Sequence, residues 1–131
     1  MKKANLLIDC QDHLGEGVLW SKTDQKLYWL VVPMPSKLHQ LHIPTNNHDT
    51  FDMPEMITAM SVRPSGDLLI ASHHGINNFN FENKELTKIL DIEPHLPNNR
   101  CNDGASDAKG RFWIGTMQNN IKMCKVDGLS H

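Results

Sequence analysis

A repeat with a period in the low forties most constrains how this chain can fold. Three segments each place a polar turn before an apolar run, and the turns are centred on Asp24-Gln25, Ser65-Gly66-Asp67 and Lys109-Gly110. The equivalent apolar positions Leu27, Leu68 and Phe112 lie 41 and 44 residues apart. Short strands joined by hairpin turns at this spacing are typical of the blades of a β-propeller.

The segments between these repeats also favour short strands. A second strand is expected at 37–43, 75–81 and 121–126, and a third at 48–51 and 86–90. No window shows a sustained helical stripe of apolar residues, and seven prolines interrupt the chain too often for long helices. We therefore expect an all-β fold, a partial β-propeller of about three blades. A β-sandwich with a similar number of strands is the alternative, and the repeat disfavours it.

Composition and charge exclude several classes of protein. The chain has 131 residues, enough for one domain, and 39% apolar and 21% charged residues suit a globular protein. The formal net charge of −2 offers no basic face for a nucleic acid. No apolar run approaches the roughly 20 residues that span a membrane. The first apolar stretch ends at Asp9, too early for a signal peptide, so a cytoplasmic location is expected.

The cysteines and histidines give no metal-binding pattern. Cys10, Cys101 and Cys124 are widely spaced and form no C-x-x-C motif, so neither a zinc site nor a disulfide framework is indicated. Reduced, partly buried thiols are expected. His39 and His42 would lie on opposite faces of a strand, and the adjacent His73-His74 pair would also diverge. We interpret the eight histidines as surface or turn residues.

The three tryptophans mark the expected apolar strands. Trp20, Trp29 and Trp113 each stand in or beside an apolar run, so we expect them to mark buried strands.

Two polar motifs could carry chemistry. Glu16 stands between Gly15 and Gly17, where the backbone can approach a ligand closely, and its carboxylate suits a divalent cation if it points into a cavity. The alternative is an exposed turn glutamate. The second motif, residues 99–104, is expected to form a tight turn directly before the apolar strand at 110–117.

Within the second motif, Arg100 offers a planar set of donors to a hydroxyl-rich or carboxylate-bearing ligand. Asn102 can offer its amide oxygen to a metal or its NH₂ group to a sugar hydroxyl. Asp103-Gly104 could equally be only a turn, with the carboxylate accepting backbone hydrogen bonds.

Taken together, N-R-x-N-D-G at 99–104, G-R-x-W-x-G-T-M at 110–117 and L-G-E-G at 14–17 resemble the SMP-30/gluconolactonase/regucalcin-like family of sugar lactone lactonases, from about residue 12 to 127. The resemblance implies a six-bladed β-propeller with one divalent cation (Ca²⁺, Zn²⁺, Mg²⁺ or Mn²⁺) in its axial channel. It implies that Glu16 is a metal ligand and that Arg100 and Asn102 contact the substrate. The family's other metal ligands, an asparagine and the acid/base aspartate, lie in later blades, so no catalytic residue is assigned in this chain.

Two positions depart from the family pattern. Family members usually carry an aspartate where Val31 stands, and some carry a substrate-contacting glutamate near the position of Asn120. Both departures leave the identity of the lactone open.

The resemblance predicts that residues 1–131 are the N-terminal part of a single, truncated propeller domain. The expected ligand is a small sugar lactone, and an open blade face at the C-terminal end could support self-association. One carboxylate and one amide are fewer than the six or more oxygens that hard cations take, so a monomer is expected to be a poor catalyst. Two alternatives stay open: a non-catalytic propeller module that binds a metal or partner, and a truncated product without independent activity.

Overall fold

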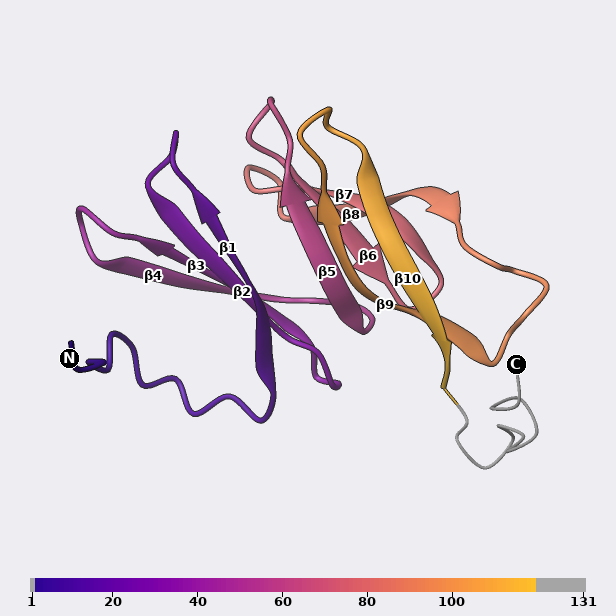
Figure 1. Ribbon diagram of the computed structural model, residues 1–131, viewed down its shortest axis with the longest axis horizontal. Helices are drawn as coiled ribbons and strands as arrows, with labels where there is room; N and C mark the ends of the chain where they lie inside the picture. The colour runs from indigo at the N-terminus through magenta and orange to yellow at the C-terminus, as the bar shows by residue number, and fades with distance from the viewer. Residues whose placement is uncertain (1, 120–131) are drawn as a thin grey trace.

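The computed structural model describes residues 2–119, which form ten antiparallel strands in three sheets (Figure 1). The first sheet contains β1 (Gly15–Ser21), β2 (Lys26–Val31), β3 (Lys37–His42) and β4 (Asn47–Asp52). The second contains β5 (Ile57–Val62), β6 (Leu68–Ser72), β7 (Gly75–Asn80) and β8 (Glu85–Asp91). The third pairs β9 (Asn99–Ser106) with β10 (Phe112–Gln118). No helix able to span a membrane occurs among these residues.

The repeat predicted from the sequence corresponds to the first hairpin of each sheet. The three polar turns connect β1 to β2, β5 to β6 and β9 to β10. Gln25, Gly66 and Gly110 adopt positive φ angles of 53°, 94° and 78° within them, as tight turns often require. The expected second and third strands are confirmed as β3, β7, β4 and β8, whereas the strand expected at 121–126 lies outside the described residues. The prediction of an all-β chain is therefore confirmed.

The alternation of side chains along each strand buries one face of the first sheet against the second. Tyr28 and Leu30 on β2 and Leu38 on β3 point to the same face and are at most 1% exposed. They join a cluster with Met53, which follows β4, and with residues of the second sheet, namely Ile57, Met60, Leu68, Ile70 and Phe79. This cluster is the main core of the described chain.

A smaller core joins the second sheet to β9. Ala59, Ala71, Ile76 and Cys101 form it, and the small alanine side chains let β5 and β9 approach closely. Cys101 is 1% exposed, and burial raises the pKa of its thiol. Cys10 and Cys101 are free thiols, as predicted, while Cys124 lies outside the described residues.

Each sheet finishes before the next begins, because the strand order within both complete sheets follows the chain order. β5 contacts β1 on one side and β9 on the other, so the first strands of successive sheets lie next to one another (Figure 1). Sequential sheets with adjacent first strands are the arrangement of propeller blades, and the two-sheet sandwich is excluded for these residues.

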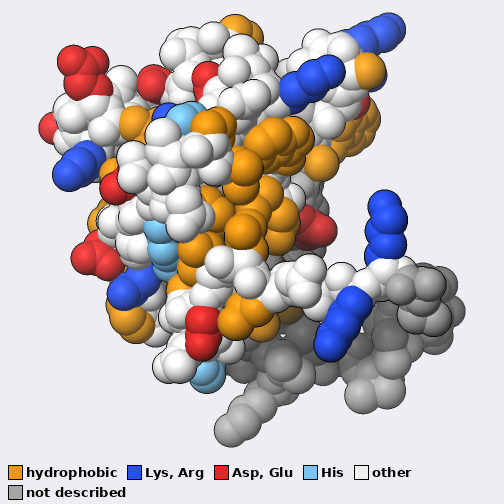
Figure 2. Space-filling model, turned by 90° about the vertical axis from the view of Figure 1, so that its left-hand side faces the viewer, with side chains coloured by type: hydrophobic (Ala, Val, Ile, Leu, Met, Phe, Trp, Pro, Cys, Tyr) orange, Lys and Arg blue, Asp and Glu red, His pale blue; other side chains and the backbone are white. Residues whose placement is uncertain are grey.

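The tryptophans were expected to mark buried strands, and none of the three side chains is fully buried, since Trp29 is only partly buried and the other two are exposed. Trp20 is 49% exposed and Trp113 is 62% exposed. Their neighbours Leu19 and Ile114 pack on the two cores, so the alternation of the strand turns both indoles to the opposite face. Figure 2 shows hydrophobic side chains gathered in the middle of the face that the first sheet presents.

The interpretation of the histidines as surface or turn residues is wrong for His39. It lies in β3, is 3% exposed and stacks on Trp29, with 4.7 Å between ring centroids. His73 and His74 do not diverge, since their rings stack at 4.1 Å. The two residues lie in the short connection between β6 and β7, where strand alternation does not apply.

Candidate functional site

The first strands of the three sheets surround one cavity of about 620 Å³. Glu16 comes from β1 and Asn102 from β9, and both line this cavity. Other polar residues on its wall are Ser61, Asp103 and Ser106. Two of the three site residues predicted from the sequence are thus brought to one place by strands far apart in the chain.

A β-bulge lies in each strand that borders the cavity. On β1 the pairing with β2 shifts between Glu16 and Leu19, and on β9 the pairing with β10 shifts across Asn102 and Asp103. β5 has a similar shift across Thr58. A bulge adds a residue to one strand and re-aims the side chains beside it, and bulges are common next to functional sites. The bulges therefore account for how Glu16 and Asn102 come to face the cavity.

The segment 99–104 was expected to form a tight turn, and that expectation is wrong. It lies within β9 and pairs with β10 from Asn99 opposite Gln118 to Gly104 opposite Ile114. The Asn-Asp-Gly composition reflects the bulge and a close strand contact. A Cβ atom at Gly104 would lie 2.4 Å from the backbone oxygen of Trp113, so only glycine fits there.

Arg100 lies beside the cavity and is not part of its lining. Its Nε donates to Asn119 Oδ1 at 3.0 Å, and its Nη1 donates to the backbone oxygen of Cys101 at 3.0 Å. Nη1 also lies 3.5 Å from Asn102 Oδ1, which places the guanidinium next to the amide that lines the cavity.

Glu93 fastens the start of β9 to β10. Its carboxylate accepts hydrogen bonds from Thr116 Oγ1 and from Asn99 Nδ2, each at 2.7 Å. These two hydrogen bonds, the one from Thr116 first, hold the pKa of Glu93 below its usual value. An ionised Glu93 therefore fixes the strand position immediately before Arg100.

Ser61 and Ser106 were not singled out in the sequence, although they lie on the cavity wall. Their hydroxyls are 2.6 Å apart and link β5 to β9. The only sequence feature that could have indicated Ser106 is its repeat position, which is that of Ser21, just before the polar turn. Ser61 stands in an apolar run, and no sequence feature indicated that it belongs to the site.

The donor set on the cavity wall fits a hard divalent cation. Glu16 and Asp103 supply carboxylate oxygens and Asn102 an amide oxygen, and all three side chains are solvent-exposed. Asp103 Oδ1 accepts a hydrogen bond from the Gly104 N–H at 2.8 Å, which leaves its second oxygen for another partner. These oxygens are fewer than the six to eight that calcium takes, so by themselves they would supply only part of a coordination shell.

Of the two positions that depart from the family pattern, one is described. Val31 is 6% exposed and pairs with Gly15, next to the strand position of Glu16. Asn120 lies outside the described residues.

Solved structures share this fold. A calcium-binding protein, regucalcin, from Agrobacterium tumefaciens superimposes with a TM-score of 0.74 and 31% identity, over 82% of this chain and 36% of that one. A luciferin-regenerating enzyme gives the same TM-score at 23% identity, over 83% of this chain and 38% of its own. The prediction of a partial β-propeller is confirmed.

Curated relatives agree with the structural comparison. The chain is 29% identical over 119 residues to a 6-deoxy-6-sulfogluconolactonase of Pseudomonas putida, covering 87% of this chain and 40% of the relative. It is 30% identical over 116 residues to an L-arabinolactonase of Azospirillum brasilense, covering 86% and 37%. The chain thus spans about two-fifths of the length of these relatives. Residues 14–129 match the sequence profile described as SMP-30/Gluconolactonase/LRE-like region. The chain belongs to the SMP-30/gluconolactonase/LRE-like family.

Proposed function

We propose that this chain forms the first part of a divalent-cation-dependent sugar lactonase. The observation that carries the proposal is the convergence of Glu16 and Asn102 on one cavity, each from the bulged first strand of its sheet. A scaffold alone has no physical need for an exposed carboxylate and an exposed amide at these two bulges.

In this proposal Glu16 is the metal ligand supplied by the chain, and Asn102 lies close to the metal and contacts the substrate. A divalent cation held there would polarise a lactone carbonyl and lower the pKa of a bound water. Arg100 donates to an oxygen of the substrate, since its Nη1 already lies beside Asn102 Oδ1. The remaining metal ligands and the acid/base aspartate belong to later blades of the family's fold.

The names of the relatives support a lactone of a sugar acid as the substrate. A 6-deoxy-6-sulfogluconolactonase and an L-arabinolactonase are both similar to this chain, and they differ in the sugar they are named for. The calcium-binding regucalcin structure supports a divalent cation. Residues 1–131 would then be the N-terminal part of a single propeller domain.

The test is the initial rate of glucono-1,5-lactone hydrolysis by the purified chain with added Mn²⁺ or Zn²⁺, followed by excess chelator. We expect a slow rate above the spontaneous background, since only part of the metal shell is present, and its loss with chelator. Glu16→Gln should reduce the rate to background. A rate that survives both chelator and Glu16→Gln would contradict the proposal. No chelator-sensitive rate at all would leave the chain as a non-catalytic propeller module.

A further inference from the structure

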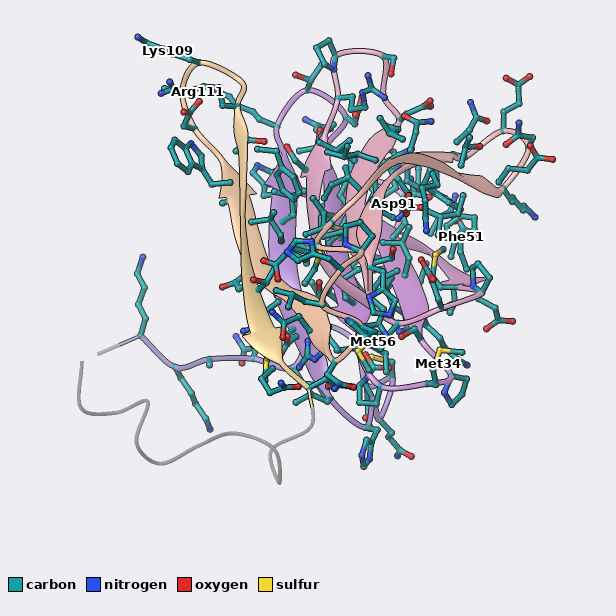
Figure 3. All side chains as sticks on the ribbon, turned by 90° about the vertical axis from the view of Figure 1, so that its right-hand side faces the viewer. Met34, Phe51, Met56, Asp91, Lys109 and Arg111 are labelled. Atoms are coloured by element: carbon teal, nitrogen blue, oxygen red, sulfur yellow. The ribbon has the colours of Figure 1, made fainter. Side chains whose placement is uncertain are left out.

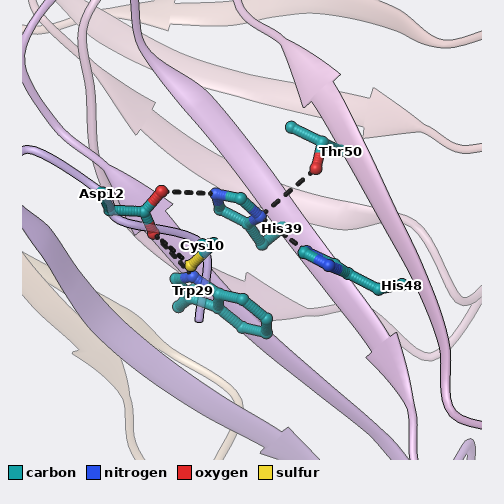
Figure 4. Close-up of polar contacts among 6 residues, drawn as sticks. All are labelled: Cys10, Asp12, Trp29, His39, His48 and Thr50. Atoms are coloured by element: carbon teal, nitrogen blue, oxygen red, sulfur yellow. Dashed lines mark hydrogen bonds and ion pairs between the residues drawn. The ribbon is translucent and has the colours of Figure 1, made fainter. Parts of the chain in front are cut away.

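A second group of metal-ligating side chains shares no residue with the lining of the cavity (Figure 4). It consists of Cys10 and Asp12 in the segment before β1 and His39 in β3. Trp29 and His39 alternate with the core residues Leu30 and Leu38 along their strands, so they point to the opposite face of the sheet. This group therefore shares no residue with the cavity and does not depend on the proposed lactonase function.

We propose that Cys10, Asp12 and His39 bind a zinc ion. One ligand atom from each residue lies within 4.8 Å of the other two. Cys10 Sγ is 3.1 Å from Asp12 Oδ2, and His39 Nε2 is 3.0 Å from Asp12 Oδ1. Ligands of a tetrahedral zinc with bonds of about 2.1 Å stand roughly 3.4 Å apart, so small movements would admit the ion.

The chemistry of the three ligands selects zinc over the hard cations. A thiolate and an imidazole are ligands for zinc and related first-row metals, whereas calcium and magnesium take oxygen. Three protein ligands leave a fourth tetrahedral position for water. The oxygen donors of the cavity, Glu16 and Asn102, have the opposite preference, and the two sites would therefore take different ions.

The surroundings hold His39 in the orientation that a ligand needs. Its other ring nitrogen, Nδ1, lies 2.8 Å from His48 Nε2 and 3.3 Å from Thr50 Oγ1. Without an ion, Nε2–H donates to Asp12 Oδ1 at 3.0 Å. Zinc would take the place of that proton, and Nδ1–H would then donate to His48 Nε2 or Thr50 Oγ1, which is how ligating histidines are commonly oriented.

A hydrogen bond from Trp29 likewise orients the carboxylate of Asp12. Trp29 Nε1 donates to Asp12 Oδ2 at 3.0 Å, and the indole stacks on the His39 ring with an angle of 4° between their planes. Gln11 lies between the ligands Cys10 and Asp12 in the sequence. It has a φ of 52°, a conformation uncommon for residues other than glycine.

The site is sheltered but reachable. The side chain of His39 is 4% exposed and that of Asp12 is 13% exposed. A hollow of about 450 Å³ is lined by Cys10 and Asp12, so an ion can reach two of the three ligands from it.

The test is a Co²⁺ titration of the reduced chain, because a cobalt–thiolate bond gives a near-ultraviolet charge-transfer band. We expect one equivalent of Co²⁺ to produce the band and Zn²⁺ to remove it by displacement. Zinc should also raise the melting temperature, since an ion that binds only the folded state stabilises it.

Variants identify the thiolate. Cys10→Ser should abolish both the band and the zinc-dependent rise in melting temperature, whereas the matched control Cys101→Ser/Cys124→Ser should keep both. Asp12→Asn, which retains a hydrogen-bond acceptor, should weaken cobalt binding at least about tenfold even if Cys10→Ser does not fold. The proposal is overturned if the parent chain shows no band, if the band survives in Cys10→Ser, or if it depends on Cys101 or Cys124.

Discussion

Glu16 on β1 and Asn102 on β9 face the same cavity, and β5 lies between their strands. Each residue lies at a bulge where the pairing with the neighbouring strand shifts. The site is thus built by backbone irregularities on rigid, paired strands. Its integrity should depend on the residues that shape the bulges as much as on the ligands themselves.

Gly104→Ala should damage the bulge on β9. The added Cβ would meet the backbone oxygen of Trp113 at 2.4 Å, so the two strands must move apart. We expect a loss of about 1–3 kcal/mol in the free energy of unfolding, as for other overpacked positions, together with weaker cation binding at the cavity. Gly115→Ala in the same hairpin is the control, because its Cβ would lie 3.7 Å from the nearest atom. Equal losses in the two variants, measured by urea unfolding, would contradict this interpretation.

Phe79→Ala should show how strongly the first two sheets depend on their shared core. Phe79 is 1% exposed and packs edge-on against Phe51 and Phe81, with centroids 5.4 Å and 5.1 Å away. Removing the ring should cost about 3–5 kcal/mol of unfolding free energy. Ile89→Ala on β8 removes a side chain from a residue that is 54% exposed and should change stability by less than about 0.5 kcal/mol. Similar changes in the unfolding free energy of both variants would contradict the assignment of Phe79 to the main core.

Asp107 should make the β9–β10 hairpin sensitive to acid. Hydrogen bonds from Trp113 Nε1 and from the backbone N–H of Arg111 lower the pKa of Asp107 from 3.8 to about 2. Since the folded pKa lies below the unfolded one, the carboxylate stabilises the fold above pH 3.8 and loses this effect as the pH falls to about 2. Lys109 and Arg111 lie at the tip of this hairpin (Figure 3).

Melting temperatures of the parent and Asp107→Asn across this range test the prediction. The parent should melt at a higher temperature near neutral pH, and the difference should shrink as the pH falls from 3.8 towards 2. A difference that stays constant over this range would show that the charge of Asp107 contributes nothing to the hairpin.

The sequence was sufficient to predict the fold because the repeat is a local signal. A polar turn followed by an apolar run appears at Leu27, Leu68 and Phe112, and each copy is the first hairpin of a sheet. Side chains alternate between the two faces of each strand, as expected. This alternation does not predict the burial of Trp20 and Trp113, because it places a residue on one face of the sheet but does not say which face is covered.

The site was only partly predictable, since its geometry depends on pairing between strands. Residues 99–104 have the composition of a turn, and pairing with β10 and packing on β5 override that local preference. The cluster of Cys10, Asp12 and His39 carried no motif at all. It exists because β3 pairs with β2 in the register that sets His39 beside Trp29, and because the segment before β1 crosses that face.

The central claim is a cation site in the cavity. The most direct test is to titrate the chain with Mn²⁺ and to measure binding as the decrease of the free-ion signal in electron paramagnetic resonance. The measurement uses a Cys10→Ser background, so that the Cys10 cluster does not contribute. We expect weak binding of one ion, weakened at least about tenfold by Glu16→Gln, since the loss of even an outer-shell partner costs about 10- to 100-fold in affinity. Glu82→Gln, which alters an exposed turn glutamate after β7, should change nothing. Equal Mn²⁺ binding by the Glu16→Gln variant and its parent would contradict a cation site in the cavity.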